Sequence, residues 1–185
     1  MSKFLIEDRP TLTCMIQART PERVSELIKK GLDGGTDAFA IQIDQLEREY
    51  RTESCYRVLF EKMGGKPVYV TDYRNNMSTG MTDGELADEL LTLAKSGAAL
   101  VDVMSDLYCP SKDEITRDSA ADAKQRELIN KIHSYGAEVL MSSHTYRFLN
   151  FDEVREIAKI QSDRGADIVK IVAAASSKIG ELSIP

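Results

Sequence analysis

The sequence lacks several features that would assign it to common classes of protein. Its three cysteines, at positions 14, 55 and 109, are widely spaced and form no Cys-x-x-Cys pair. This spacing argues against a disulfide framework or a zinc site and favours a reducing environment. No apolar run approaches the about 18 residues that a membrane-spanning helix needs, and the N-terminal residues show no signal-peptide pattern. We therefore expect a cytoplasmic protein that neither spans nor crosses a membrane.

The sequence also lacks a cluster of basic residues. It contains 24 Lys and Arg against 30 Asp and Glu, which gives a net charge of -6. Nucleic acids and anionic membranes are bound mainly through basic patches, so we expect neither as a partner. The glycine-rich motifs of dinucleotide- and phosphate-binding loops are missing as well.

Short apolar segments alternate with longer amphipathic segments along the chain. A glycine precedes most of the apolar segments by two or three residues, as a helix end followed by a turn requires. Such alternation predicts parallel strands with helices packed outside them. The predicted strands are 11–17, 37–44, 67–71, 100–104, 138–143 and 167–172, and the predicted helix starts are Thr20-Pro21, Thr82 with Glu85, Ser111 with Glu114, and Asn150 with Glu153.

Polar residues stand at the C-terminal ends of nearly all the predicted strands. An open α/β sheet usually concentrates its chemistry at one point, whereas a (β/α)8 TIM barrel collects side chains from many strand ends. We therefore predict an α/β fold of the TIM-barrel type, as one domain over residues 1–185. A complete barrel has eight βα units and usually about 250 residues, so six units predict an incomplete barrel. Its two open edges favour a homo-oligomer, most simply a dimer, a partner chain that supplies the missing units, or a longer natural chain of which this sequence lacks the C-terminal part.

One lysine and one histidine occupy unusual places in the last two predicted strands. His144 ends the segment Val139–His144, and Lys170 lies inside the apolar segment Ala166–Ile171. A single predicted helix separates the segments, so they should be parallel neighbours, about 4.8 Å apart. Burying an ammonium group is costly, and a neutral amine can attack a carbonyl. The pattern therefore predicts Lys170 and His144 as catalytic residues that face one cavity.

Other ionisable residues give weaker signals. His133 lies near the end of a predicted helix, where the helix dipole favours a cation, and we interpret it as structural. Asp44, Asp72 and Asp102 could form a carboxylate metal site, but no second histidine lies near them in the sequence. We expect no metal and no cofactor.

Five segments of the chain carry a pattern that is known from one enzyme family. They are G35-T-D-A-F-A-I-Q-I-D44, K66-P-V-Y-V-T-D-Y-R74, V101-D-V-M104, V139-L-M-S-S-H144 and G165-A-D-I-V-K-I171. In the content and order of these segments, the whole chain resembles the N-terminal three quarters of the type I 3-dehydroquinate dehydratases. The resemblance implies a Schiff-base lyase in which Lys170 forms the imine and His144 is the general acid/base. It also implies that the partner is a small-molecule substrate, a cyclic keto acid, and that Arg74 binds it.

The sequence departs from the family pattern at several substrate-binding positions. Ala40 and Gln42 replace a glutamate and an arginine of the second strand, and Met104 replaces a glutamate of the fourth. Ser78 stands where the family has a loop glutamate, and nothing in the chain matches the family's seventh and eighth strands. By position, the predicted substrate-binding residues are Arg74, Gln42 and Ser78.

The resemblance implies a hydro-lyase that converts 3-dehydroquinate to 3-dehydroshikimate, a reaction of the shikimate and quinate routes and of aromatic amino acid biosynthesis. Two alternatives remain open. One is a non-catalytic relative or binding subunit, which the neutral residues Ala40, Gln42 and Ser78 favour. The other is a class I aldolase-like lyase, because several such enzymes carry a Schiff-base lysine on the sixth strand of the same fold.

Overall fold

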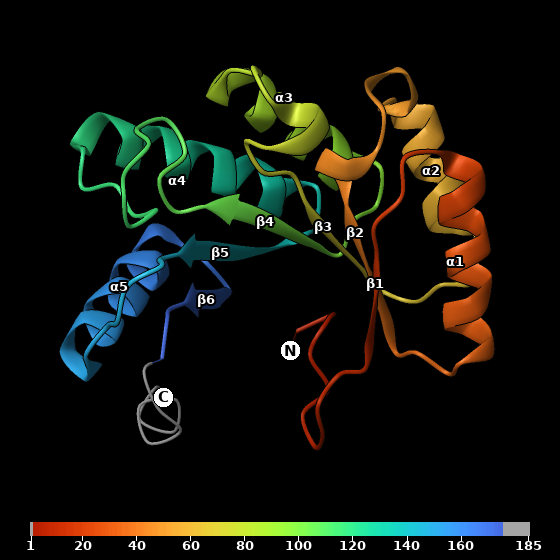
Figure 1. Ribbon diagram of the computed structural model, residues 1–185, viewed down its shortest axis with the longest axis horizontal. Coiled ribbons are helices and arrows are strands. Elements are labelled where there is room, and N and C mark those ends of the chain that lie inside the picture. Colours follow the sequence, from red (N-terminus) through yellow and green to blue (C-terminus); the bar gives the residue numbers. More distant parts are fainter. Residues whose placement is uncertain (1, 176–185) are drawn as a thin grey trace. The chain divides into compact units, whose positions relative to one another are not determined.

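The computed structural model of the chain describes residues 2–175. Parallel strands alternate with helices, and the order of the strands in the sheet is their order in the chain (Figure 1). All six predicted strands are confirmed, each to within two residues at either end. The strands are β1 (Thr13–Ile16), β2 (Ala38–Gln42), β3 (Val68–Thr71), β4 (Leu100–Met104), β5 (Glu138–His144) and β6 (Ile168–Val172).

Five α-helices separate the strands in the described part of the chain. Thr20, Thr82 and Asn150 cap three of these helices through their side-chain oxygens, and Thr82 and Asn150 form full capping boxes with Glu85 and Glu153. These three predicted starts are confirmed. The α-helices are α1 (Pro21–Asp33), α2 (Glu53–Glu61), α3 (Asp83–Lys95), α4 (Ser119–Ser134) and α5 (Phe151–Arg164), and the short 3-10 turns are η1 (Ile43–Gln45), η2 (Arg48–Tyr50) and η3 (Asn76–Ser78).

The predicted helix start at Ser111 and Glu114 is wrong. Helix α4 begins at Ser119, where the carboxylate of Asp118 accepts a hydrogen bond of 2.8 Å from the backbone N–H of Ala121. The Ser111 hydroxyl instead closes a turn by accepting from the backbone N–H of Ile115 at 2.9 Å. Glu114 itself has a φ of +48°, which no α-helix contains. The segment between β4 and α4 is therefore an ordered loop.

By their internal contacts, the strands and helices form two compact units. Of the described residues, the first unit comprises 2–102 and 131–138, and the second comprises 103–130 and 139–175. Among the described residues, no helix combines the length and the apolar character needed to cross a bilayer. The single domain that the sequence predicts stays a prediction.

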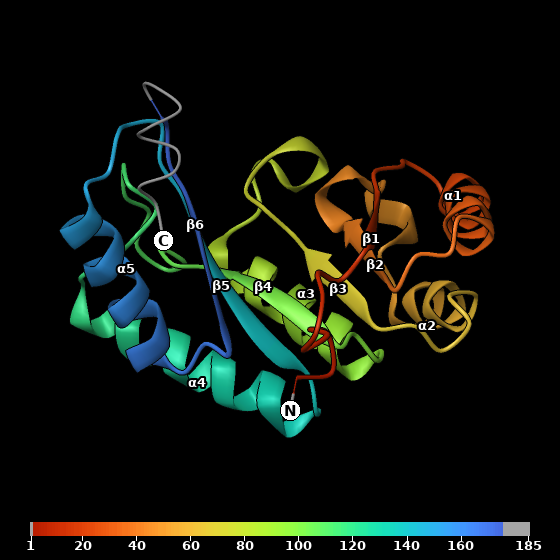
Figure 2. The ribbon, with the colours of Figure 1, turned by 90° about the horizontal axis from the view of Figure 1, so that it is seen from below.

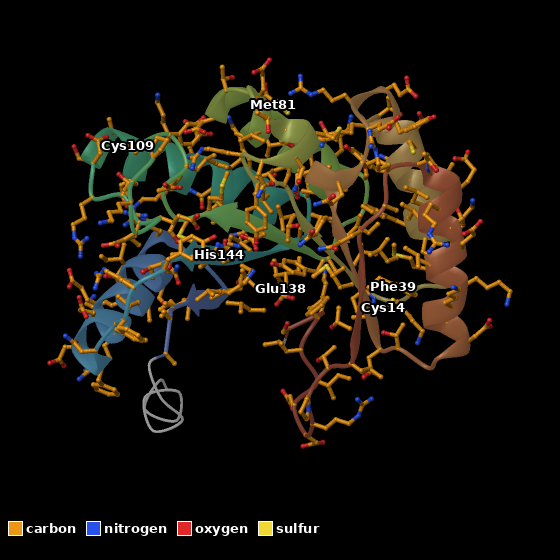
Figure 3. The ribbon with its side chains drawn as sticks, viewed as in Figure 1. Cys14, Phe39, Met81, Cys109, Glu138 and His144 are labelled. Atoms are coloured by element: carbon orange, nitrogen blue, oxygen red, sulfur yellow. The ribbon has the colours of Figure 1, made fainter. Side chains whose placement is uncertain are left out.

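In the first unit, α1 lies against β1 and beside α2 (Figure 1). Gly31 of α1 makes a close approach possible, because a Cβ atom at this position would lie 2.6 Å from Cε1 of Phe39 on β2. Figure 3 shows Phe39 beside Cys14 of β1, whose sulfur would be the next nearest atom at 3.1 Å. Larger residues than glycine would therefore push α1 away from the sheet.

In the second unit, α5 packs alongside β6 (Figure 2). Ile115, Leu149, Val154 and Ile157 form one apolar cluster of this unit, and Ile171 of β6 packs against them. Gly165 ends α5 in the left-handed conformation, with a φ of +109°, as a helix C-terminus favours. This packing fixes which face of β6 is turned toward the helix.

Candidate active site

His144 and Lys170 lie on neighbouring strands of the second unit. The parallel pairing of β5 with β6 sets Lys170 opposite Ser142, and His144 is two residues further along β5. Side chains two residues apart share a face of a strand, so the two side chains leave the same face of the sheet. This is the face opposite to Ile171, which packs against α5. Both residues are half-buried, which leaves them accessible to a small molecule.

A carboxylate from the loop between β4 and α4 contacts His144. Oε2 of Glu114 accepts a hydrogen bond of 2.8 Å from the backbone N–H of His144 and lies 2.8 Å from Nδ1 of its ring. A carboxylate at Nδ1 favours the tautomer with its proton on that nitrogen. Nε2 is then the ring nitrogen that can accept a proton. Figure 3 shows His144 at the end of β5.

Sequence reasoning missed Glu114 as a candidate site residue. Its φ of +48° is uncommon for a residue other than glycine, and such conformations gather at functional sites. The loop that carries Glu114 is held in place by its own hydrogen bonds, which include one of 2.8 Å from the backbone N–H of Ser111 to the carboxylate of Asp106. The backbone N–H of Thr116 also donates to the carbonyl of Ser105 at 3.1 Å.

Gln42 lies at the C-terminal end of β2 in the first unit. Its Oε1 accepts a hydrogen bond of 2.6 Å from Nε2 of Gln17, which directly follows β1. Two neutral amides therefore meet at this edge of the sheet. An amide pair can bind hydroxyl or carboxylate groups by hydrogen bonds but supplies no net charge.

Arg74 pairs with Asp83, the first residue of α3. Nε and Nη2 of Arg74 donate to the two carboxylate oxygens at 2.7 and 3.0 Å, and the Arg74 side chain is 26% exposed. This bidentate pair offsets the charge of the guanidinium. A substrate carboxylate would therefore have to share Arg74 with Asp83.

Ser78 is enclosed within the first unit. Its hydroxyl donates to Oδ1 of Asp72 at 2.5 Å and accepts from Nη1 of Arg51 at 2.9 Å, and its exposed fraction is 0%. In this arrangement the hydroxyl contacts buried protein groups. Its predicted role in substrate binding would require the turn η3 to move.

Asp72 is a buried carboxylate whose ionisation opposes folding. Burial, followed by the nearby negative charge of Glu89, raises the pKa of Asp72 to about 7, although Ser78 and Arg51 act in the opposite direction. In the unfolded chain an aspartate has a pKa of about 3.9. As the pH rises between these two values, the unfolded state loses its proton first and becomes relatively more stable.

We therefore expect the free energy of unfolding to fall by about 2–4 kcal/mol between about pH 4 and pH 7 through Asp72. Asp72→Asn cannot ionise and should flatten this part of the pH dependence, as measured by urea unfolding at pH 5 and pH 8. Asp88→Asn is a suitable control, because it removes the same charge from an exposed position of α3. Equal pH dependence in the wild type and Asp72→Asn would contradict the assignment.

Asp44, Asp72 and Asp102, which the sequence suggested as possible metal ligands, are hydrogen-bonded to other protein groups. Asp44 accepts a hydrogen bond of 2.5 Å from Nδ2 of Asn76, and Asp102 accepts hydrogen bonds from the hydroxyls of Tyr69 and Tyr73. Within residues 2–175, His, Cys, Asp and Glu side chains do not form a group of three that could hold a metal ion.

A protein-family model described as type I 3-dehydroquinase matches residues 12–180 of the chain. No match to a curated protein sequence was found. Among solved structures, a 3-dehydroquinate dehydratase from Enterococcus faecalis is similar with a TM-score of 0.80 and 18% identity. This similarity covers 99% of the present chain and 75% of the other.

Two further structures extend the comparison. A type I 3-dehydroquinate dehydratase from Clostridium difficile, with covalently modified comenic acid, has a TM-score of 0.77 and 17% identity, over 96% of the present chain and 68% of its own. A deoxyribose phosphate aldolase from Aeropyrum pernix has a TM-score of 0.55 and 17% identity, over 88% and 62% of the two chains. These similarities confirm the predicted α/β fold of the TIM-barrel type.

Proposed function

Because the chain belongs to the type I 3-dehydroquinase family, we propose that it is a Schiff-base lyase that dehydrates 3-dehydroquinate to 3-dehydroshikimate. The observation that carries this proposal is the register of β5 and β6, which directs His144 and Lys170 to one face of the sheet. The contact between Glu114 and the His144 ring supports it further. The proposal includes a place in the shikimate or quinate route, a cytoplasmic setting and a homodimer.

Lys170 supplies the covalent step of the proposed mechanism. Its neutral amine adds to the C3 carbonyl of the substrate, and loss of water from the adduct gives a protonated imine on Nζ. The iminium group withdraws electrons from C2 and so acidifies the proton there. The scheme needs no metal and no organic cofactor.

His144 moves the protons in the proposed mechanism. Nε2 accepts the C2 proton, the electron pair forms an enamine, and the C1 hydroxyl leaves as water after Nε2 returns a proton to it. Hydrolysis of the conjugated imine then releases 3-dehydroshikimate and restores Lys170. Glu114 holds the Nδ1 side of the ring and stabilises the positive imidazolium that forms in the first proton transfer.

Arg74 and Gln42 complete the proposal as substrate-binding residues. The guanidinium of Arg74 would bind a carboxylate or hydroxyl of the substrate while sharing its charge with Asp83. The amide of Gln42 would accept or donate one hydrogen bond. Ser78 would contribute only after a movement of η3, since its hydroxyl is buried.

Three observations favour an alternative in which the chain binds a ligand without converting it. Ala40 is buried and neutral, Arg74 is paired with Asp83, and Ser78 is enclosed. Removing one electrostatic or orienting group from an active site typically lowers the rate by about 100-fold or more. The fold alone is also compatible with a class I aldolase-like lyase, because it is shared with the deoxyribose phosphate aldolase.

A turnover assay with 3-dehydroquinate tests the proposed function. We expect the purified chain to generate the conjugated enone product, followed by its ultraviolet absorption. Expression in a host without a dehydratase of its own removes the background that a trace of host enzyme would give. If no product forms at high protein concentration while calorimetry shows that 3-dehydroquinate binds, the lyase hypothesis is wrong. The alternative, a ligand-binding protein, would then be supported.

A further inference from the structure

An arginine after β5 joins three segments of the second unit around the candidate base. Nε and Nη2 of Arg147 donate to the two carboxylate oxygens of Asp113 at 3.0 and 3.1 Å. Its Nη1 donates to Oε1 of Glu153, in the first turn of α5, at 2.7 Å. Arg147 lies three residues after His144, and Asp113 directly precedes Glu114. The guanidinium of Arg147 therefore links the segment that carries His144 to the segment that carries Glu114.

Glu114 needs such support, because its backbone does not adopt this conformation readily. A left-handed conformation costs a residue with a Cβ atom roughly 1–2 kcal/mol. On the C-terminal side of Glu114, the backbone N–H of Ile115 donates to the Ser111 hydroxyl, and the Ile115 side chain is buried in the core. On the N-terminal side, the bidentate pair of Asp113 with Arg147 is the anchor. Strained conformations of this kind persist only where both sides are held.

We propose that Arg147 is a positioning residue, which acts through Asp113 to hold Glu114 against His144. The expected effect on kcat rests on the proposed function, whereas the expected effect on the His144 tautomer does not. Arg147 contacts no reacting atom in the proposed mechanism. Its role is to fix the orientation and the tautomer of the base.

Electrostatics agrees with this geometry. The bonds from Arg147 lower the pKa of Asp113 below its ordinary value. The pKa of Glu153 is also lowered, first by the backbone N–H of Asn150 and then by Arg147. Both carboxylates therefore stay ionised near neutral pH, and a single guanidinium offsets their mutual repulsion.

The same loop offers a matched control. Nη2 of Arg117 donates to Oε1 of Glu156 on α5 at 2.6 Å, so this second ion pair also ties the loop to the helix. Arg117 lies beyond Glu114 in the chain, and the side chains of Arg117 and Glu156 are 59% and 58% exposed. Arg117→Ala therefore removes a cross-link of the same kind without releasing Asp113.

Two-bond nitrogen–proton correlation spectra measure the tautomeric state of the His144 ring and so test this proposal directly. The chain has two histidines, so His133→Gln is sufficient to assign the signals. We expect the wild type to show the tautomer protonated on Nδ1 and Arg147→Ala to show a mixture of tautomers. Arg147→Lys, which keeps the charge but loses the bidentate geometry, should lie between them. Arg117→Ala should give the wild-type spectrum.

Kinetics supply the second measurement. If the wild type converts 3-dehydroquinate, Arg147→Ala should lower kcat by about 10- to 100-fold while KM changes by less than about threefold. In the Glu114→Ala background, Arg147→Ala should have little further effect, because the contact between residue 114 and His144 has already been removed.

The outcomes separate this proposal from the proposed function. A wild-type tautomer in Arg147→Ala, or an equal change in Arg117→Ala, would overturn the role of Arg147 whether or not the chain is an enzyme. A tautomer change confined to the Arg147 variants supports the role of Arg147 even if the wild type proves inactive. In that case only the proposed function fails.

Discussion

Lys170→Ala is expected to abolish the covalent adduct that 3-dehydroquinate and borohydride form with the wild-type chain. Borohydride reduces an imine to a stable amine, so intact-protein mass spectrometry should show a ligand-sized increase in the wild type and none in the variant. Turnover should fall by about 10⁴-fold or more, because an alanine cannot replace the nucleophile. This is the largest effect that the proposed mechanism predicts.

Lys159→Ala is the matched control for this experiment. Lys159 lies on α5 with its ammonium paired to Asp163 at 2.5 Å, and its side chain is 74% exposed. Its removal tests whether borohydride traps surface lysines without selectivity. An adduct of equal yield in Lys170→Ala would contradict the assignment of Lys170, and no adduct in the folded wild type would contradict a Schiff-base mechanism.

His144→Ala is expected to lower kcat by about 10²- to 10⁴-fold, the usual contribution of a general acid/base. The imine on Lys170 should still form, but more slowly, because His144 also moves protons during its formation and hydrolysis. If His144→Ala still forms the trapped adduct but no longer turns over, imine formation by Lys170 is separate from proton transfer by His144. The measurements are the progress curve of the enone product and the yield of borohydride-trapped protein.

His133→Gln serves as the comparison for this variant. His133 lies in the last turn of α4 and comes from a different segment of the chain. Its substitution should leave kcat within about twofold. Normal turnover in His144→Ala would exclude His144 as the base and direct attention to other groups on the same face of the sheet.

The strands and most helix ends could be predicted because their signals are local. Thr82 and Glu85, three residues apart, form the capping box that their spacing predicts. The same spacing in Ser111 and Glu114 misled the prediction, because a serine followed by a glutamate can also close a turn. The spacing of Ser111 and Glu114 does not reveal that Glu114 has a positive φ.

The contacts of the candidate site could be predicted only in part. The length of one βα unit predicted that Lys170 and His144 lie on neighbouring strands, and the alternation of side chains predicted which residues share their faces. The register, with Lys170 opposite Ser142, comes from the structure. The contact of Glu114 with His144 joins residues 30 positions apart and depends on how a loop packs.

The predicted substrate-binding residues show the same limit. Position in the family pattern identified Ser78 and Arg74, but it could not reveal that Ser78 is bonded to Asp72 and Arg51. Nor could it reveal the bidentate pair of Arg74 with Asp83. Both arrangements depend on how side chains from different segments pack, which a position in the family pattern does not specify.

The backbone at position 114 also has a consequence for protein engineering. A procedure that chooses substitutions from backbone preference would replace Glu114 by glycine or asparagine, since these residues enter the left-handed region most easily. That choice would remove the carboxylate that contacts His144. Engineering for stability should therefore keep Glu114. Substitutions that raise the free energy of unfolding should be sought far from the loop between β4 and α4.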